Sequence, residues 1–100
     1  MKIIDLQQCD AEEYVKRDKN VLFHNDRFKT RIIVLEPGKS IPKCTMESHI
    51  IFVVIAGEVT IHKNGEFERL KANQMLVSEP ADFSMETDIG ARILGVQIKV

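Results

Sequence analysis

The stretch from His49 to Glu66, HIIFVVIAGEVTIHKNGE, limits the folds open to this chain more than any other segment does. Its β-branched residues favour extended strands. Asn64-Gly65 is a strong hairpin signal, because both central positions of a type I′ turn require a positive φ. The strand before this turn is therefore expected to pair with EFERLKA, residues 66–72. A chain built around such a hairpin is predominantly β.

Other short segments rich in β-branched and aromatic residues flank this hairpin. They recur at roughly ten-residue spacing and are separated by turn residues. We predict further strands at 21–28, 30–36, 74–80 and 91–100. Such a run of short strands predicts an all-β sandwich or barrel.

The N-terminal arm, residues 1–20, carries a different pattern. Lys2–Leu6 is predicted as an edge strand. The spacing of Asp10 and Glu13 is typical of a capping box and predicts a short helix over residues 10–18. The remaining residues, 21–100, are expected to form the barrel, and no linker divides the 100 residues, so a single domain is predicted.

Charge and hydropathy narrow the function classes. The net charge of −1 provides no general attraction to nucleic acid or to an anionic membrane. The longest apolar run, Ile50–Ala56, is too short to span a bilayer, so a cytoplasmic location is expected. Cys9 and Cys44 do not form a CxxC pair and are predicted to be free thiols.

Ile50–Ile55 is apolar at both its odd and its even positions, whereas a strand with one solvated face would alternate between apolar and polar residues. We therefore expect this strand to be covered on both faces. A second copy of the chain could provide the outer cover in a domain of this size, and a homodimer is predicted.

The segment EPGKSIPKCTMESHIIFVVIAGEVTIHKNGEFERLKANQMLVSEPADF resembles the cupin superfamily, and specifically its small single-domain proteins of the conserved-barrel, or cupin 2, type. The resemblance covers about residues 30–100. Gly38 and Gly57 match the glycines at the two ends of the family's first motif, and Asn73 stands where the second motif has a glycine. The resemblance implies a jelly-roll barrel, also called a double-stranded β-helix, here with a short N-terminal helix.

Family members that keep the metal-binding motifs hold iron, manganese, zinc or nickel. In this chain the positions of the metal ligands correspond to Cys44, Met46, Ile50 and Phe83, so both motifs are degenerate. Ile50 and Phe83 have no donor atoms, and a catalytic metal site usually needs three protein ligands. We therefore expect no metal cofactor and no metal-dependent catalysis. These substitutions do not exclude an enzymatic activity that needs no metal.

A soft-metal centre is the alternative. Cys44 and Met46 lie two residues apart in an expected strand, so their sulfur atoms share a face and could bind an ion such as copper(I). His49 is the nearest third candidate, but strict alternation directs it to the opposite face unless a bulge intervenes. A reactive thiol at Cys44 is a further possibility.

By the same resemblance, six residues line the barrel interior where metal and substrate would lie: Cys44, Met46, Ile50, Phe52, Phe83 and Met85. Their side chains are all apolar or soft, which suits a small apolar or aromatic ligand, or simply a filled core. The predicted function is therefore ligand binding, or a structural or regulatory role, by a cupin-like barrel. The alternative is an enzyme or metal-binding protein with the soft-metal centre.

Three cations alternate with uncharged residues at Arg27, Lys29 and Arg31. Alternation along an extended segment would place them on one face. That row could be an anion site or a solvated outer face, and the solvated face is the favoured interpretation.

Overall fold

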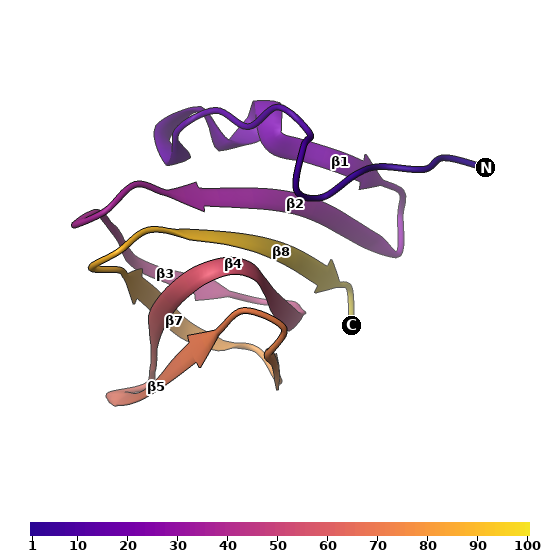
Figure 1. The fold of residues 1–100 in the computed structure, drawn as a ribbon. Coiled ribbons are helices and arrows are strands. Elements are labelled where there is room, and N and C mark those ends of the chain that lie inside the picture. Colours follow the sequence, from indigo (N-terminus) through magenta and orange to yellow (C-terminus); the bar gives the residue numbers. More distant parts are fainter.

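Eight antiparallel strands follow a short 3₁₀ helix in the computed structural model, which describes residues 1–100 (Figure 1). The strand order is β1-β2-β8-β4-β7-β3, and β5 and β6 also pair with β4. The predicted all-β barrel is confirmed. In chain order the elements are η1 (Tyr14–Asn20), β1 (Val21–His24), β2 (Phe28–Leu35), β3 (Ser40–Met46), β4 (His49–Lys63), β5 (Glu66–Lys71), β6 (Met75–Ser78), β7 (Ala81–Glu86) and β8 (Ala91–Ile98).

Strand β4 joins the two layers of the barrel, because its two halves have different neighbours. The half that ends at Gly57 pairs with β8 and β6. The half that begins at Glu58 pairs with β5 and β7. The register against β8 shifts between Val54 and Ala56, as at a β-bulge. Figure 1 shows the strand curving from the side of β8 towards β5.

Gly57 makes this bend possible. Its φ is +78°, and a Cβ added there would lie 2.0 Å from the carbonyl oxygen of Gly90. The next residue, Glu58, donates its backbone N–H to that same carbonyl at 3.1 Å, and the hydroxyl of Thr87 donates to the Glu58 carbonyl at 2.6 Å. Gly57 therefore lies inside the longest strand, where two backbones touch.

The tight turns follow the expected residue chemistry. Asn64 and Gly65 have φ values of 49° and 88°, so the predicted type I′ conformation between β4 and β5 is confirmed. Asn73, which stands at a glycine position of the cupin pattern, also has a positive φ, 71°. Asparagine tolerates this left-handed region better than most residues, so the turn is preserved without glycine.

The core lies between the two layers and is built from the inward-facing residues of the strands. Within it, the rings of Phe52 and Phe83 meet edge to face at 5.8 Å. The buried apolar residues of this cluster are Ile33, Leu35, Ile41, Ile50, Phe52, Val54, Val59, Ile61, Leu70, Phe83, Met85, Ala91 and Ile93.

The outer face of β4 is only partly covered. Ile51, Val53 and Ile55 are half-buried in the isolated chain. Beside them on β6, Met75 and Val77 remain 62% and 63% exposed. The apolar character of both faces of β4 is therefore not explained by contacts within one chain.

The arm differs from the prediction in two places. Lys2–Leu6 is not a strand, because the Asp5 carboxylate accepts hydrogen bonds from the backbone N–H groups of Gln7 and Gln8 and turns the chain. The helix predicted over 10–18 is instead the 3₁₀ helix η1, kinked at Lys16 and without a side-chain cap. The predicted capping box is therefore wrong.

The strand predicted over 21–28 is also shorter in the structure. It ends at His24, because the Asn25 side chain accepts hydrogen bonds from the backbone N–H groups of Arg27 and Phe28 and begins a turn. Strand β7 was not among the predicted strands, although its residues alternate between apolar and polar. No helix in the fold has the length and hydropathy needed to cross a bilayer.

Gly57→Ala is expected to destabilise the fold far more than Gly38→Ala. Both glycines have a positive φ near 80°, but a Cβ at Gly38 meets nothing within 4 Å. The Gly38 variant should lose about 1–2 kcal/mol through backbone strain alone. The Gly57 variant should lose more, because the Gly90 carbonyl must also move. Urea unfolding measures both, and equal losses would contradict this account of the bend.

Candidate ligand cavity

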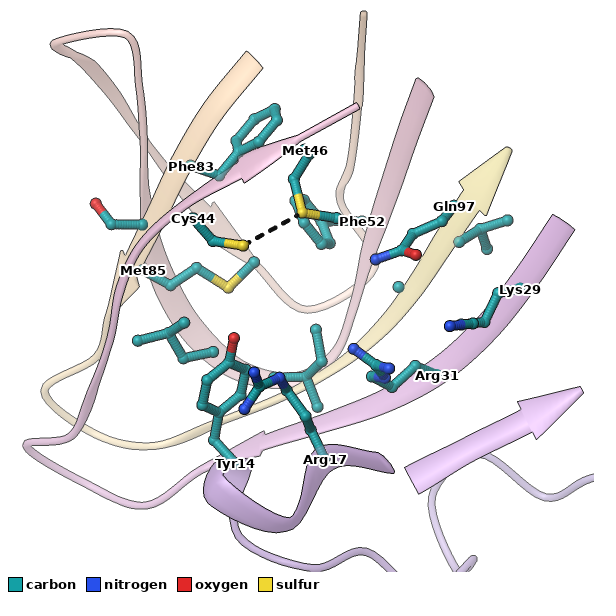
Figure 2. Close-up of a pocket in the computed structure, with 15 residues that line it drawn as sticks. Tyr14, Arg17, Lys29, Arg31, Cys44, Met46, Phe52, Phe83, Met85 and Gln97 are labelled. Carbon is teal, nitrogen blue, oxygen red and sulfur yellow. Dashed lines mark hydrogen bonds between the residues drawn. The ribbon is translucent and has the colours of Figure 1, made fainter. Parts of the chain in front are cut away.

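A cavity of about 120 Å³ opens into the barrel (Figure 2). Its walls are formed by residues of β2, β3, β7 and β8, with contributions from β4 and from η1. Most of its lining residues are apolar, and none is acidic. Gly95 lies in the wall, and the absence of a side chain there leaves part of the space open.

Five of the six residues predicted for the interior line this cavity: Cys44, Met46, Phe52, Phe83 and Met85. Ile50 does not. Its side chain is fully buried within the apolar core, where neighbouring residues enclose it. The Ile50 side chain is therefore enclosed by packing and does not contribute to the open space.

Sulfur-bearing side chains gather on one wall. The Sγ of Cys44 lies 3.8 Å from the Sδ of Met46, and Figure 2 shows Met85 beside them. Cys44 is exposed, so its thiol is accessible at the rim. His49 is exposed, lies opposite Ile98 in the β4–β8 pairing and does not line the cavity, so the set Cys44, Met46 and His49 is not brought together.

No three or more His, Cys, Asp or Glu side chains are grouped so that they could hold a metal ion. His62 is directed elsewhere, to the carboxylate of Glu86 at 3.0 Å. A soft-metal site would therefore depend on thioether sulfur as well as on the single thiolate of Cys44.

The opposite wall carries cations. Lys29 and Arg31 reach the cavity from β2, and Arg17 reaches it from η1, as Figure 2 shows. The solvated-face interpretation is therefore wrong for Lys29 and Arg31, while Arg27 lies exposed in the turn before β2. Lys29, Arg31 and Ile33 follow one another at two-residue spacing in β2, so their side chains lie on the same face of the strand. Ile33 belongs to the core, and this spacing is the sequence signal that places Lys29 and Arg31 on the inner face.

The Arg31 side chain is only 16% exposed. Its Nε atom is the one buried side-chain nitrogen or oxygen without a hydrogen-bond partner. Its Nη2 atom lies 3.9 Å from Oδ1 of Asp18, beyond hydrogen-bond distance, and the Asp18 side chain is 99% exposed. Such an ion pair at the surface contributes little, so the charge of Arg31 is poorly compensated.

Within the arm, two hydrogen bonds join the residues before η1 to the last residue of η1. The buried Asn20 side chain accepts from the backbone N–H of Glu12 at 2.7 Å and donates to its carbonyl at 2.8 Å. Within η1, the guanidinium of Arg17 lies 4.7 Å from the centre of the Tyr14 ring. Sequence reasoning missed Tyr14 and Arg17, because no periodicity relates a short irregular helix to a distant strand.

Arg92 anchors the start of the arm to β8. Its Nε donates to the carbonyl of Leu6 at 2.6 Å, and Nη2 contacts both the carbonyl and the Sγ of Cys9. Cys9 and Cys44 are both unpaired. The thiol of Cys9 is thus held in a structural contact, whereas that of Cys44 faces the cavity.

Two carboxyl groups outside the cavity have lowered pKa values. For Asp82, the hydrogen bond from Thr45 at 2.7 Å is the largest cause, followed by Lys43. For Glu79, a hydrogen bond from its own backbone is the largest cause, followed by the charge of Lys63. A carboxylate with a lowered pKa stabilises the folded state at pH values above its ordinary pKa. This stabilisation is lost as the pH falls through the lowered pKa.

No protein-family model matches the sequence, and no curated protein matches it. Solved structures do match. A conserved protein with a double-stranded β-helix domain from Klebsiella pneumoniae has a TM-score of 0.84 at 16% identity, over 98% of this chain and 90% of the other. A conserved protein of unknown function from Streptococcus pyogenes has a TM-score of 0.81 at 17% identity, over 99% and 88%.

A cupin superfamily protein from Desulfitobacterium hafniense has a TM-score of 0.77 at 14% identity, over 95% of this chain and 87% of the other. Identities this low show the fold and leave the chemistry of the site to this chain's own residues. The eight strands, the bend in β4 and these likenesses together show that the chain has the cupin fold.

Proposed function

We propose that this protein binds a small organic molecule inside its barrel and does not catalyse a metal-dependent reaction there. The observation that carries the proposal is the open, mostly apolar cavity, which adjoins the positions where the cupin pattern places metal and substrate. Its volume of about 120 Å³ is close to that of an engineered apolar cavity of about 150 Å³ that binds benzene. A single small ring or a short branched chain would fit.

The residues at the family's ligand positions support the absence of a metal centre of the usual kind. Ile50 and Phe83 carry no donor atoms and are both buried in the apolar core. Only Cys44 and Met46 retain atoms that could bind a metal, and both are soft ligands. The lining is therefore better suited to apolar contact than to holding a hard or borderline ion.

Filling the cavity should abolish binding. A Cβ at Gly95 would lie 3.3 Å from Cδ1 of Ile33 and 3.6 Å from Cε1 of Phe52, so Gly95→Leu would occupy the open space. We expect the wild type to bind toluene or benzamide, Gly95→Ala to bind more weakly and Gly95→Leu not to bind, as measured by ligand-observed NMR. Ala72→Leu adds a similar side chain at an exposed turn and should bind normally.

Thermal unfolding of each variant confirms that it is folded. Undiminished binding by a folded Gly95→Leu variant would place the ligand elsewhere. Failure of the wild type to bind any small neutral or charged probe would contradict the proposed function.

A soft-metal centre is the second candidate, favoured by the 3.8 Å separation of the sulfur atoms of Cys44 and Met46. Met85, on the same wall, is a better third ligand than His49. We expect protein purified without an affinity tag to contain no stoichiometric copper, zinc or iron by elemental analysis. Stoichiometric metal that disappears in Cys44→Ser would instead support the second candidate.

We also propose that the protein is a homodimer, formed through the outer face of β2, β8, β4 and β6. Two neighbouring rows cross these strands without any acidic or basic side chain. They are Thr30, Val96, Ile51 and Val77, and Leu94, Val53 and Met75; Ile32, at the β2 end of the second row, is fully buried within the chain and contributes no surface. A two-fold interface places a patch against itself, so an uncharged apolar patch meets no like-charge repulsion. A second copy is therefore a suitable partner for this face.

Val77→Glu should dissociate this dimer. The side chain is 63% exposed in the single chain, so the substitution leaves the fold of the monomer intact, but it brings two carboxylates together across a two-fold axis. Phe67→Glu is a matched control, because Phe67 is also 63% exposed but lies on β5. Sedimentation at micromolar concentration should show a dimer for the wild type and Phe67→Glu, and a monomer for Val77→Glu. A monomeric wild type would contradict the proposal.

A further inference from the structure

We propose that the ligand of the cavity is an anion, namely a small monocarboxylic acid, whose carboxylate is bound by Arg31 together with Lys29 and Arg17. This inference rests on the proposed small-molecule function and specifies the chemical class of the ligand. It differs from the purely apolar ligand that the predicted lining suggested, because the cations on the β2 wall were not expected there.

The charge balance of the cavity is the first argument. Arg17, Lys29 and Arg31 line it, and no Asp or Glu does. The whole chain carries a net charge of −1, so this concentration of positive charge is local. The only anionic group within 4 Å of these three cations is the Asp18 carboxylate, 3.9 Å from Arg31 and almost fully exposed to water. An anionic ligand would reduce the positive charge that the protein leaves uncompensated.

The state of Arg31 is the second argument. A buried guanidinium normally has its N–H groups satisfied by hydrogen bonds. Here the Nε–H is buried without a partner. The Nε edge of a guanidinium presents two parallel N–H groups that match the two oxygens of a carboxylate. Because Nε has almost no accessible surface, a carboxylate in the cavity would reach it after a rotation of the guanidinium and would then provide the partner that Nε lacks.

The opposite wall indicates the chemical character of the part of the ligand that is not the carboxylate. Met46, Phe52 and Met85 present apolar or thioether surface across the cavity from the cations, as Figure 2 shows. An acid with a compact apolar body would place its carboxylate on the β2 wall and its body on the β3 and β7 wall. The volume of about 120 Å³ leaves no room for a nucleotide or a sugar phosphate. Gln97 and Ser84, which also line the cavity, are uncharged and could donate hydrogen bonds to the carboxylate.

Three isosteric probes test the charge preference: benzoate, neutral benzamide and cationic benzamidine, each titrated by calorimetry or ligand-observed NMR. Isobutyrate and isobutyramide form a second pair with a smaller body. We expect each carboxylate to bind about tenfold or more tightly than its amide, and benzamidine to bind least. If amide and acid bind equally, the anion inference is wrong while the small-molecule function stands. If none of the five probes binds, the proposed function fails as well.

Arg31→Met removes the charge and keeps much of the aliphatic stem. It should lower benzoate affinity about tenfold or more while leaving benzamide affinity nearly unchanged. Arg31→Lys keeps the charge without the paired N–H groups and should be intermediate. Arg27→Met is the matched control, because Arg27 belongs to the same sequence row but lies exposed in the preceding turn.

Thermal unfolding without ligand separates a ligand-binding role of Arg31 from a structural one. We expect the melting temperature of Arg31→Met to equal or exceed that of the wild type, because the substitution removes a buried charge with poor compensation. A marked drop in melting temperature would show that Arg31 supports the fold, and would overturn its assignment to a ligand. Equal benzoate affinities of Arg31→Met and the wild type would overturn it too.

Discussion

The close approach of Gly57 to Gly90 is the contact on which the rest of the barrel depends. It allows β4 to leave the layer of β8 and enter the layer of β7, and so closes the two layers around one core. The backbone hydrogen bond from Glu58 to Gly90 and the bond from Thr87 to Glu58 hold the crossing in place. A side chain at Gly57 would separate the two backbones at this crossing.

The cavity combines two walls with different chemistry. The wall of β3 and β7 carries sulfur and apolar side chains. The wall of β2, completed by η1, carries the positive charge. Three side chains, Arg17, Lys29 and Arg31, supply this charge from the side opposite to the sulfur atoms.

Sequence reasoning reached the fold because its signals were local. The type I′ turn at Asn64-Gly65 depends on two residues, and the alternation within a strand depends on its immediate neighbours. The same local rules failed in the arm. The Asp10 capping box did not form, because the buried side chain of Asn20 binds the backbone of Glu12 and holds the segment in a kinked 3₁₀ helix. A contact between residues eight apart outweighed the helical preference.

The sequence by itself determined most of the strands, the hairpin and the soft or apolar character of Cys44, Met46 and Phe83. Only the tertiary structure decided which side of β2 faces inward, that Ile50 is enclosed in the core, and that Arg17 lines the same cavity as Arg31. The physical reason is that alternation defines two faces of a strand but does not say which is inside. That choice is made by packing β2 against β8 and η1, through contacts between residues far apart in the chain.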